Sequence, residues 1–355
     1  MSINMNIKEN VPLSQYAAFK IGGLARYFCE VKSKEELKEA VSWANKKNAP
    51  IFVLGAGSNV LVSDSGFSGL AVKNEIMGIN VFEEKSHVRA TAGAGEEWDK
   101  FVEFCVNRNL AGIECLSGIP GKVGAVPVQN IGAYGQSAAE TIESVRALDL
   151  KTNEEVLFQK HDCEFGYRTS KFKKNPDGYV ITSVSFILKF AGAPKLAYHE
   201  LKNYFAGNSS PALPEVRKAV LEIRSKKGMV MRGEELHSSV GSFFTNPIIP
   251  QESLADLKLH VEACKGIKNC CQDPWFWIRS DGRVKISAAC LIECAGFEKG
   301  LKRGSVGISS LHSLALINYG GASAKAVLDL AKEILSKVKE KFGVNLEIEP
   351  QLVGF

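Results

Sequence analysis

The sequence predicts a mixed α/β protein made of two domains, on the strength of three observations. Its 355 residues are 45% hydrophobic and 23% charged, which is enough apolar material for about two globular cores. Short apolar segments with strand character alternate with segments whose apolar residues recur at helical spacing. Glycines cluster in the N-terminal half, close behind predicted strands. We expect the second domain to begin after about residue 190.

The individual elements follow from capping signals and periodicity. Ser33-Lys-Glu-Glu36 has the form of a capping box, and apolar residues follow it at helical spacing, so a helix begins after Ser33. Similar patterns predict three further helices, over about 96–108, 214–227 and 324–342. Short apolar runs predict strands over 50–54, 60–62, 87–92, 144–150, 155–159, 180–190 and 345–353.

Charge and hydropathy narrow the class of protein. The net charge of +5 is spread over 44 basic and 39 acidic residues, with two basic runs, 171–174 and 224–227. We interpret both runs first as solvated faces, then as sites for anionic small molecules, and last as nucleic-acid contacts. No apolar run approaches the roughly 20 residues of a membrane span, and the N-terminus lacks a secretory apolar region. We therefore expect a cytoplasmic protein that binds neither membrane nor nucleic acid.

The nine cysteines are irregularly spaced, without a CxxC pair or a Cys/His grouping of zinc type. We expect reduced thiols and no metal site. Cys290 and Cys294 lie four residues apart on a predicted helix. They fit either a pair of ligands or, as we prefer, small buried apolar residues.

The first glycine-rich segment is Gly55-Ala-Gly-Ser-Asn-Val60, which follows a predicted strand as a phosphate-binding turn would. It differs from a dinucleotide fingerprint because Val60 replaces the third glycine, and no Gly-Lys-Ser/Thr follows as in a P-loop. Taken alone, the segment is typical of a plain tight turn.

The second glycine-rich segment, residues 116–135, carries one charged residue, Lys122. Disorder is unfavourable there because several isoleucines and valines would stay exposed. Glycines allow left-handed backbone and a close approach of ligand, so successive N–H groups can form an anion-binding nest. Two such loops could hold the two phosphates of a dinucleotide.

Several motifs together resemble the UDP-N-acetylenolpyruvoylglucosamine reductase family. The motifs run in the family's order and the resemblance covers about residues 13–354. They are Ala18-Phe-Lys-Ile-Gly-Gly23, Gly55-Ala-Gly-Ser-Asn59, Gly118-Ile-Pro-Gly121, Gln129-Asn-Ile-Gly-Ala-Tyr-Gly135, Phe165-Gly-Tyr-Arg-Thr-Ser170, Gly241-Ser-Phe-Phe-Thr-Asn-Pro247 and Leu346-Glu-Ile-Glu349.

The resemblance implies a fold and two cofactors. An FAD-binding α/β domain of the vanillyl-alcohol-oxidase type would cover residues 22–190, in two lobes split near residue 76. A smaller α+β substrate-binding domain would cover 191–355, its last strand being a candidate to return to the first lobe. FAD would be bound without a covalent link, and NADPH would donate hydride. The FAD-binding residues implied are Gly55, Gly57, Ser58, Asn59, Gly118, Gly121, Gly124, Asn130, Gly132, Ala133 and Tyr134.

The implied reaction reduces UDP-N-acetylglucosamine enolpyruvate to UDP-N-acetylmuramate, a step of peptidoglycan precursor synthesis. Hydride from flavin N5 adds to the terminal carbon, and negative charge develops on the α-carbon and its carboxylate. Such a site needs cations or proton donors around the carboxylate and an acid for the α-carbon.

Three residues match the family's catalytic positions. Arg168 would pair with the substrate carboxylate as a permanently charged fork. Glu349 would stabilise the same group, provided that it carries a proton, and Ser242 would protonate the α-carbon. Without the motifs, we would interpret Arg168 as a residue of a surface ion pair, Glu349 as a residue at a strand edge and Ser242 as a turn serine.

Six further residues match positions that contact the substrate. Tyr198 would cover it, although packing at a helix start is an equal alternative. Lys227, Lys299 and His312 would contact the diphosphate, with solvated lysines as the alternative. Tyr167 and Asn246 complete the set. The sequence of residues 228–240 aligns poorly with the best-known members of the family.

Two alternative functions remain open at this point. The glycine-rich loops also fit another FAD-dependent oxidase or dehydrogenase on the same scaffold, because a fold does not determine function. A basic binding module without enzymatic activity is the second alternative. For the reductase reading we expect a small-molecule substrate, UDP-N-acetylglucosamine enolpyruvate, and a monomer.

Overall fold

The computed structural model describes residues 6–85, 87–208, 210–229, 238–268, 271 and 274–355. The chain divides into two compact units. Unit 1 contains residues 1–12, 24–57 and 67–231, and unit 2 contains residues 13–23, 58–66 and 232–355. Two short N-terminal segments therefore belong to the same unit as the C-terminal third. No helix in these described ranges could span a membrane.

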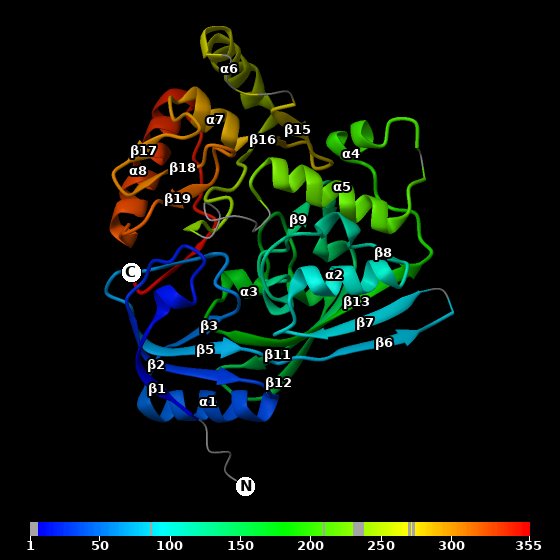
Figure 1. The fold of residues 1–355 in the computed structure, drawn as a ribbon, viewed down its shortest axis with the longest axis vertical. Coiled ribbons are helices and arrows are strands. Elements are labelled where there is room, and N and C mark those ends of the chain that lie inside the picture. Colours follow the sequence, from blue (N-terminus) through cyan, green and yellow to red (C-terminus); the bar gives the residue numbers. More distant parts are fainter. Residues whose placement is uncertain (1–5, 86, 209, 230–237, 269–270, 272–273) are drawn as a thin grey trace. The chain divides into compact units, whose positions relative to one another are not determined.

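The first sheet of unit 1 has four strands in the order β1-β2-β5-β3, with β1 antiparallel and the others parallel. Its strands are β1 (Lys8–Pro12), β2 (Leu24–Val31), β3 (Ile51–Leu54) and β5 (Phe67–Asn74). Helix α1 (Lys34–Lys47) lies along one face of this sheet (Figure 1). The Ser33 side chain caps α1 by accepting a 3.1 Å hydrogen bond from the Glu36 N–H, as the capping signal predicts.

The second sheet of unit 1 is antiparallel, in the order β12-β11-β13-β7-β6, with β8 also paired to β13. Its strands are β6 (Ile79–Glu83), β7 (Val88–Gly93), β8 (Leu110–Ala111), β11 (Ile142–Asp149), β12 (Glu155–Gln159) and β13 (Tyr179–Phe190). Helix α2 (Trp98–Asn107) packs on it through Trp98 and Phe101, whose rings lie 5.7 and 5.3 Å from the Phe186 ring. This packing produces the larger apolar core of unit 1.

The remaining elements of unit 1 are short, apart from α5 (Figure 1). They are the hairpin β9 (Gly132–Ala133) and β10 (Gln136–Ser137), and the helices α3 (Lys171–Lys174), α4 (His199–Tyr204) and α5 (Leu213–Lys226). The second glycine-rich segment, residues 116–135, thus contains the 3-10 helix Val123–Ala125 and ends in the turn of the β9–β10 hairpin.

Unit 2 contains two three-stranded sheets, β14-β16-β15 and β17-β18-β19, and a parallel pair, β20 with β4. Its elements are β4 (Val60–Val62), β14 (Ile248–Ile249), α6 (Leu254–Lys268), β15 (Phe276–Ile278), β16 (Val284–Ile286), α7 (Ala288–Cys294), β17 (Lys302–Arg303), β18 (Val306–Ile308), β19 (Leu316–Asn318), α8 (Ala324–Phe342) and β20 (Gln351–Val353). The apolar face of α8 shares its core with Phe19, Ile21 and Leu61.

Two expectations from the sequence are wrong. The strand predicted over 345–353 is limited to Gln351–Val353, because residues 347–349 bond instead to the 243–245 segment. The cysteines are not all reduced thiols, since Cys271 and Cys290 form a disulfide. Cys290 and Cys294 do lie on one helix, α7, as predicted.

Candidate active site

The first glycine-rich turn joins β3 to β4. A Cβ built on Gly55 would have one neighbouring residue within 4 Å, Lys122, whose Cγ lies at 3.5 Å. Gly55 also lies outside the left-handed backbone region, whereas Gly57 has a φ of +65°. Neither protein packing nor backbone conformation therefore requires glycine at Gly55, and its bare Cα leaves room for a ligand to approach.

The second glycine-rich segment is held by charged side chains of α2 and α5, of which the two arginines of α5 are buried. Asp99 accepts a 2.5 Å hydrogen bond from the Gly118 N–H and binds Arg217 through two bonds of 2.5 and 2.9 Å. Arg224 donates through Nε to the Gly118 carbonyl oxygen at 3.2 Å. A Cβ on Gly118 would lie 2.7 Å from Leu221, so packing against α5 explains this glycine.

The structure corrects the first interpretation of the basic run 224–227, which was that of a solvated face. The side chains of Arg217 and Arg224 both lie on the buried face of α5, and Arg224 is only 7% exposed, so this arginine is not part of a solvated face. Burial lowers the pKa of Arg224, although the nearby Tyr134 and Asp99 partly offset that effect.

We expect Asp99→Asn to lower the free energy of unfolding by about 2 kcal/mol, because it removes the carboxylate partner of a buried guanidinium. Burial of Asp99 alone would raise its pKa, but the hydrogen bonds from Arg217 and from the Gly118 N–H lower it below its ordinary value of 3.8. A group with a lowered pKa stabilises the fold above its ordinary pKa, and loses that contribution as the pH falls below it.

Chemical denaturation of the wild type and Asp99→Asn at pH 7 and between pH 5 and 2 measures both effects. The difference between the two proteins should shrink toward low pH. Glu97→Gln is the matched control, because Glu97 pairs with Lys100 at the surface at 2.9 Å and should matter little. An unchanged stability of Asp99→Asn at pH 7 contradicts the assigned role of this pair.

The β9–β10 hairpin turns at Tyr134 and Gly135, whose φ angles are +48° and +81°. Two consecutive residues with positive φ form the tight turn that suits a two-residue hairpin. A buried carboxylate holds the hairpin in place: Glu114 accepts hydrogen bonds from the Gln136 side chain at 3.2 Å and from the Lys195 N–H at 3.0 Å. The same residue thus joins the hairpin to the segment that leads to Tyr198.

Tyr134, Tyr198 and Lys227 lie together. The two tyrosine rings meet edge to face at 5.5 Å, and the Lys227 ammonium lies 5.9 Å from the Tyr134 ring centroid. Lys227 also forms an ion pair of 2.6 Å with Glu200. Burial, and to a lesser degree Glu200, raises the pKa of Tyr198 to about 12, so this phenol stays protonated and can donate a hydrogen bond.

Arg168 lies in a tight turn that is bound to the second glycine-rich segment. Its φ is +51°, and its guanidinium donates to the Gly132 carbonyl oxygen at 2.9 Å. The Lys173 ammonium donates to the Arg168 carbonyl oxygen at 3.0 Å. The Asn130 side chain donates to the Gly166 carbonyl oxygen at 2.9 Å and accepts the Ala139 N–H at 2.9 Å. Arg168 is therefore positioned through both its backbone and its side chain.

In unit 2, Ser242 and Glu349 lie on neighbouring segments of chain. The Glu349 N–H donates to the Phe243 carbonyl oxygen at 2.9 Å, and the Phe243 N–H donates to the Leu314 carbonyl oxygen at 2.7 Å. Ser242 itself pairs with Ala315 in an isolated antiparallel bridge. Three strand-like segments, around residues 242–245, 314–315 and 347–349, therefore run side by side, and Ser242 and Glu349 lie on two of them.

His312 is next to these segments, and its ring accepts the Leu314 N–H at Nδ1 at 3.0 Å. A nitrogen that accepts carries no proton, so the neutral ring carries its proton on Nε2 and can donate from that atom. Lys299 lies 3.8 Å from the Glu293 carboxylate, and Asn246 accepts from the Ala288 N–H at 2.9 Å.

The predicted residues are thus divided between the two units. Unit 1 contains Arg168, Tyr167, Tyr198, Lys227, Gly55, Gly57 and the FAD-binding residues of the second loop. Unit 2 contains Ser242, Glu349, Asn246, Lys299, His312, Ser58 and Asn59. The departure over residues 228–240 falls largely outside the described residues, which omit 230–237.

Comparisons with known proteins show which family the chain belongs to. Residues 234–353 match the UDP-N-acetylenolpyruvoylglucosamine reductase C-terminal domain, and residues 25–156 match an FAD-binding domain. The UDP-N-acetylenolpyruvoylglucosamine reductase of Thermobifida fusca is 41% identical to this chain, over 98% of each sequence. The chain belongs to the UDP-N-acetylenolpyruvoylglucosamine reductase family.

Solved structures extend the comparison to the fold. The UDP-N-acetylenolpyruvylglucosamine reductase of Thermus caldophilus is 25% identical, with a TM-score of 0.65 over 98% of this chain and 99% of that one. A 4-ethylphenol oxidase from Gulosibacter chungangensis is 11% identical, with a TM-score of 0.52 over 93% and 82%, and shares the fold alone. The predicted flavoprotein fold and FAD binding are confirmed.

Sequence reasoning missed three residues that support this reductase-family site. Glu114, Arg224 and Glu293 are buried or half-buried charges that fix predicted site residues or loops. For the arginine there was a signal, because Arg217 and Arg224 occupy the apolar face of an amphipathic helix. The two glutamates act through contacts distant in the sequence, and no local pattern marks them.

Proposed function

We propose that this chain catalyses the NADPH-dependent, FAD-mediated reduction of UDP-N-acetylglucosamine enolpyruvate to UDP-N-acetylmuramate, a step of peptidoglycan precursor synthesis. The observation that carries the assignment of roles is the backbone hydrogen bond of 2.9 Å that joins Glu349 to the residue after Ser242. Family membership over nearly the full chain favours this reaction over that of another flavin-dependent oxidase.

The residues of unit 1 fit a bound FAD. The open Cα face of Gly55 and the nearly uncharged second loop suit a close approach of the pyrophosphate to backbone N–H groups. Lys122 is the one charged side chain of that loop, and it pairs with Glu75 at 3.2 Å. Gly55 and Gly57 would therefore hold the cofactor mainly through backbone groups, and the family resemblance assigns Ser58 and Asn59 to the same role.

When bound, the flavin supplies the hydride that adds to the terminal carbon of the enolpyruvyl group. Arg168 would bind the substrate carboxylate and offset the negative charge that develops on it. Ser242 would deliver its proton to the α-carbon, and the protonated Glu349 would donate a hydrogen bond to the carboxylate. Alcohol oxidation requires no proton donor to a carbanion, so this trio suits reduction.

The diphosphate of the substrate would meet the remaining cations and donors. Lys299, Lys227 and the Nε2–H of His312 are each chemically suitable donors to phosphate oxygens. Tyr198, which keeps its proton at neutral pH, would cover the substrate, and Tyr167 and Asn246 would contact it. We further propose that the protein acts as a monomer in the cytoplasm.

Gly55→Val tests the role of the first turn. The backbone there tolerates a side chain and the protein leaves room for one, so the variant should fold with an unchanged Tm in the absence of cofactor. A branched side chain would block the approach of the pyrophosphate, and we expect at least a tenfold loss of FAD affinity. Flavin fluorescence titration of the apoprotein measures that affinity.

Gly192→Ala is the matched control for steric damage at a glycine outside the FAD-binding set. A Cβ on Gly192 would lie 2.8 Å from the Lys189 Cβ, so this variant should lose stability first. If Gly55→Val binds FAD like the wild type, the first turn does not hold the cofactor.

A further inference from the structure

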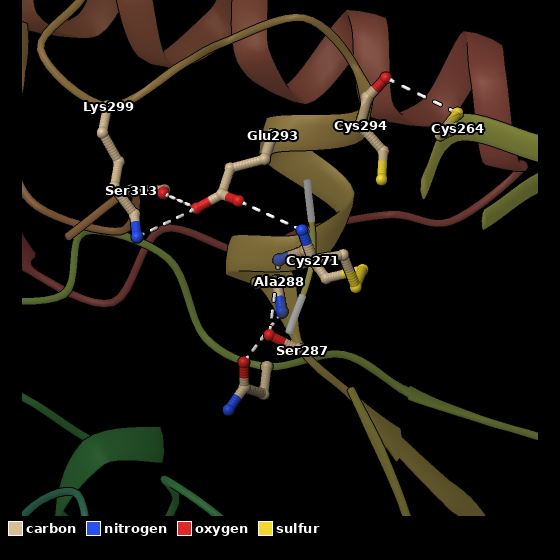
Figure 2. The surroundings of a disulfide bond; sticks show 10 residues. Cys264, Cys271, Ser287, Ala288, Glu293, Cys294, Lys299 and Ser313 are labelled. Atoms are coloured by element: carbon tan, nitrogen blue, oxygen red, sulfur yellow. Dashed lines mark hydrogen bonds and ion pairs between the residues drawn. A yellow bond between two sulfur atoms is a disulfide. The ribbon is translucent and has the colours of Figure 1, made fainter. Parts of the chain in front are cut away.

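The disulfide of unit 2 joins Cys271, which follows α6, to Cys290 in the first turn of α7 (Figure 2). Both residues are buried in the core of unit 2, with 8% and 3% of their surfaces exposed. Cys271 has a φ of +71°, in the left-handed region that residues other than glycine rarely adopt. Such a conformation persists only where the surrounding bonds hold it.

Glu293 connects this disulfide to a proposed substrate residue. Its Oε2 accepts the Cys271 N–H at 3.3 Å, and its Oε1 accepts the Ser313 hydroxyl. The same Oε1 lies 3.8 Å from the Lys299 ammonium. Figure 2 shows one carboxylate between the disulfide on one side and Lys299 on the other.

The helix start provides a second connection. The Ser287 hydroxyl accepts the Cys290 N–H at 3.3 Å and so begins α7. The first N–H of the helix, that of Ala288, donates to the Asn246 side-chain oxygen at 2.9 Å. Each cysteine of the disulfide is therefore connected, through Glu293 or through the start of α7, to a residue that the proposed function places on the substrate.

We propose that Cys271 and Cys290 form a reversible thiol–disulfide modification site that controls affinity for the nucleotide-diphosphate part of the substrate. The proposal rests on the proposed function for the role of Lys299 and Asn246. The redox partner is a low-molecular-weight thiol and its disulfide.

The exchange balances without any other reactant. The thiolate of one cysteine attacks the small disulfide, forms a mixed disulfide and releases one small thiolate. The second cysteine then attacks its neighbour's sulfur, forms the Cys271–Cys290 bond and releases the second thiolate. Two protein thiols are oxidised, their two protons pass to the released thiolates, and one small disulfide is reduced to two thiols.

Reduction should weaken substrate binding. Once the sulfur–sulfur bond is broken, Cys271 can leave its left-handed conformation, and its N–H then moves away from Glu293. With one donor fewer, the Glu293 carboxylate holds Lys299 more strongly and withdraws it from the diphosphate. We expect KM for the enolpyruvyl substrate to rise roughly fivefold on reduction, the scale of one ordinary hydrogen bond, with kcat changed less than twofold.

The test uses the full-length flavoprotein equilibrated in reduced or oxidised dithiothreitol. Iodoacetamide labelling and peptide mass analysis should show Cys271 and Cys290 alkylated only after reduction. KM should differ roughly fivefold between the two states. Failure of either cysteine to change its labelling overturns the proposal, and so does an equal KM with complete conversion.

Variants separate the coupling from general effects. Cys290→Ser should keep the higher KM in both buffers. Cys264→Ser, at a buried thiol of the same core, should retain the redox shift. Glu293→Gln should form the disulfide normally and lose the shift in KM; a full shift in this variant refutes the coupling through Glu293.

Binding of UDP-N-acetylglucosamine by calorimetry gives a comparison without turnover. A Kd that is higher in the reduced state supports the redox site even in a protein that fails to reduce the enolpyruvyl ether, an outcome that would contradict the proposed function alone. Equal Kd and equal KM in both states contradict the redox site and leave the proposed reaction intact.

Discussion

Ser242→Ala should reduce flavin with NADPH at nearly the wild-type rate and then fail to pass the hydride on. Arrival of hydride at the flavin requires no proton at the substrate α-carbon, whereas product formation does. Loss of a general acid lowers a rate by roughly 100-fold or more, so reoxidation by the enolpyruvyl substrate should slow by at least ~100-fold.

Anaerobic stopped-flow absorbance of the flavin measures the two half-reactions separately. Ser239→Ala is a matched control, because the Ser239 hydroxyl accepts the Gly241 N–H at 3.1 Å and shapes the same turn. Ser239→Ala should affect both half-reactions modestly. Equal slowing of both half-reactions by Ser242→Ala would indicate a defect of folding or binding and would contradict a proton-donor role.

Substitutions of Glu349 should show whether it acts as a neutral hydrogen-bond donor. The substrate carboxylate gains negative charge during the reaction, and an ionised glutamate nearby would repel it. Glu349→Gln keeps the shape and a neutral donor, whereas Glu349→Asp keeps a titrating group but withdraws it. We expect Glu349→Gln to preserve roughly tenfold more of the reoxidation rate than Glu349→Asp.

Single-turnover reoxidation of both variants across pH 6–9 measures this ranking. An aspartate variant that is faster than the glutamine variant throughout that range contradicts the neutral-donor role. Glu347→Gln is the control, because Glu347 lies two residues away and is exposed.

Much of the secondary structure could be predicted from local signals. Helix α8 has the predicted bounds, because Ser323 caps its start, Gly343 ends it in left-handed conformation, and the intervening apolar residues recur at helical spacing. The Ser33 cap of α1 follows from the same kind of local signal.

Contacts between distant segments could not be predicted in this way. Residues 13–23 and 58–66 join unit 2 because β4 pairs with β20 and because Asn318 donates to the Phe19 carbonyl at 3.0 Å. The segment 345–353 has an extended pattern, but its middle bonds to residues 243–245 and only its end continues as β20. The pairing of Cys271 with Cys290 likewise depends on tertiary structure.

The candidate site shows the same division. The residue types of Arg168, Ser242 and Glu349 and their flanking motifs identify the trio from the sequence. The supports of the site do not follow from any motif: Glu114, Glu293 and Lys173 each act on a residue through a contact that only the folded chain creates.

Transfer of hydride from NADPH through FAD to the enolpyruvyl ether can be followed directly in an anaerobic experiment. The purified flavoprotein is reduced with one equivalent of NADPH, and UDP-N-acetylglucosamine enolpyruvate is then added. We expect the flavin absorbance to return in full, and mass spectrometry to find a product 2 Da heavier than the substrate, one molecule for each flavin. A flavin that stays reduced in the presence of excess substrate, with the substrate mass unchanged, would contradict the proposed reaction.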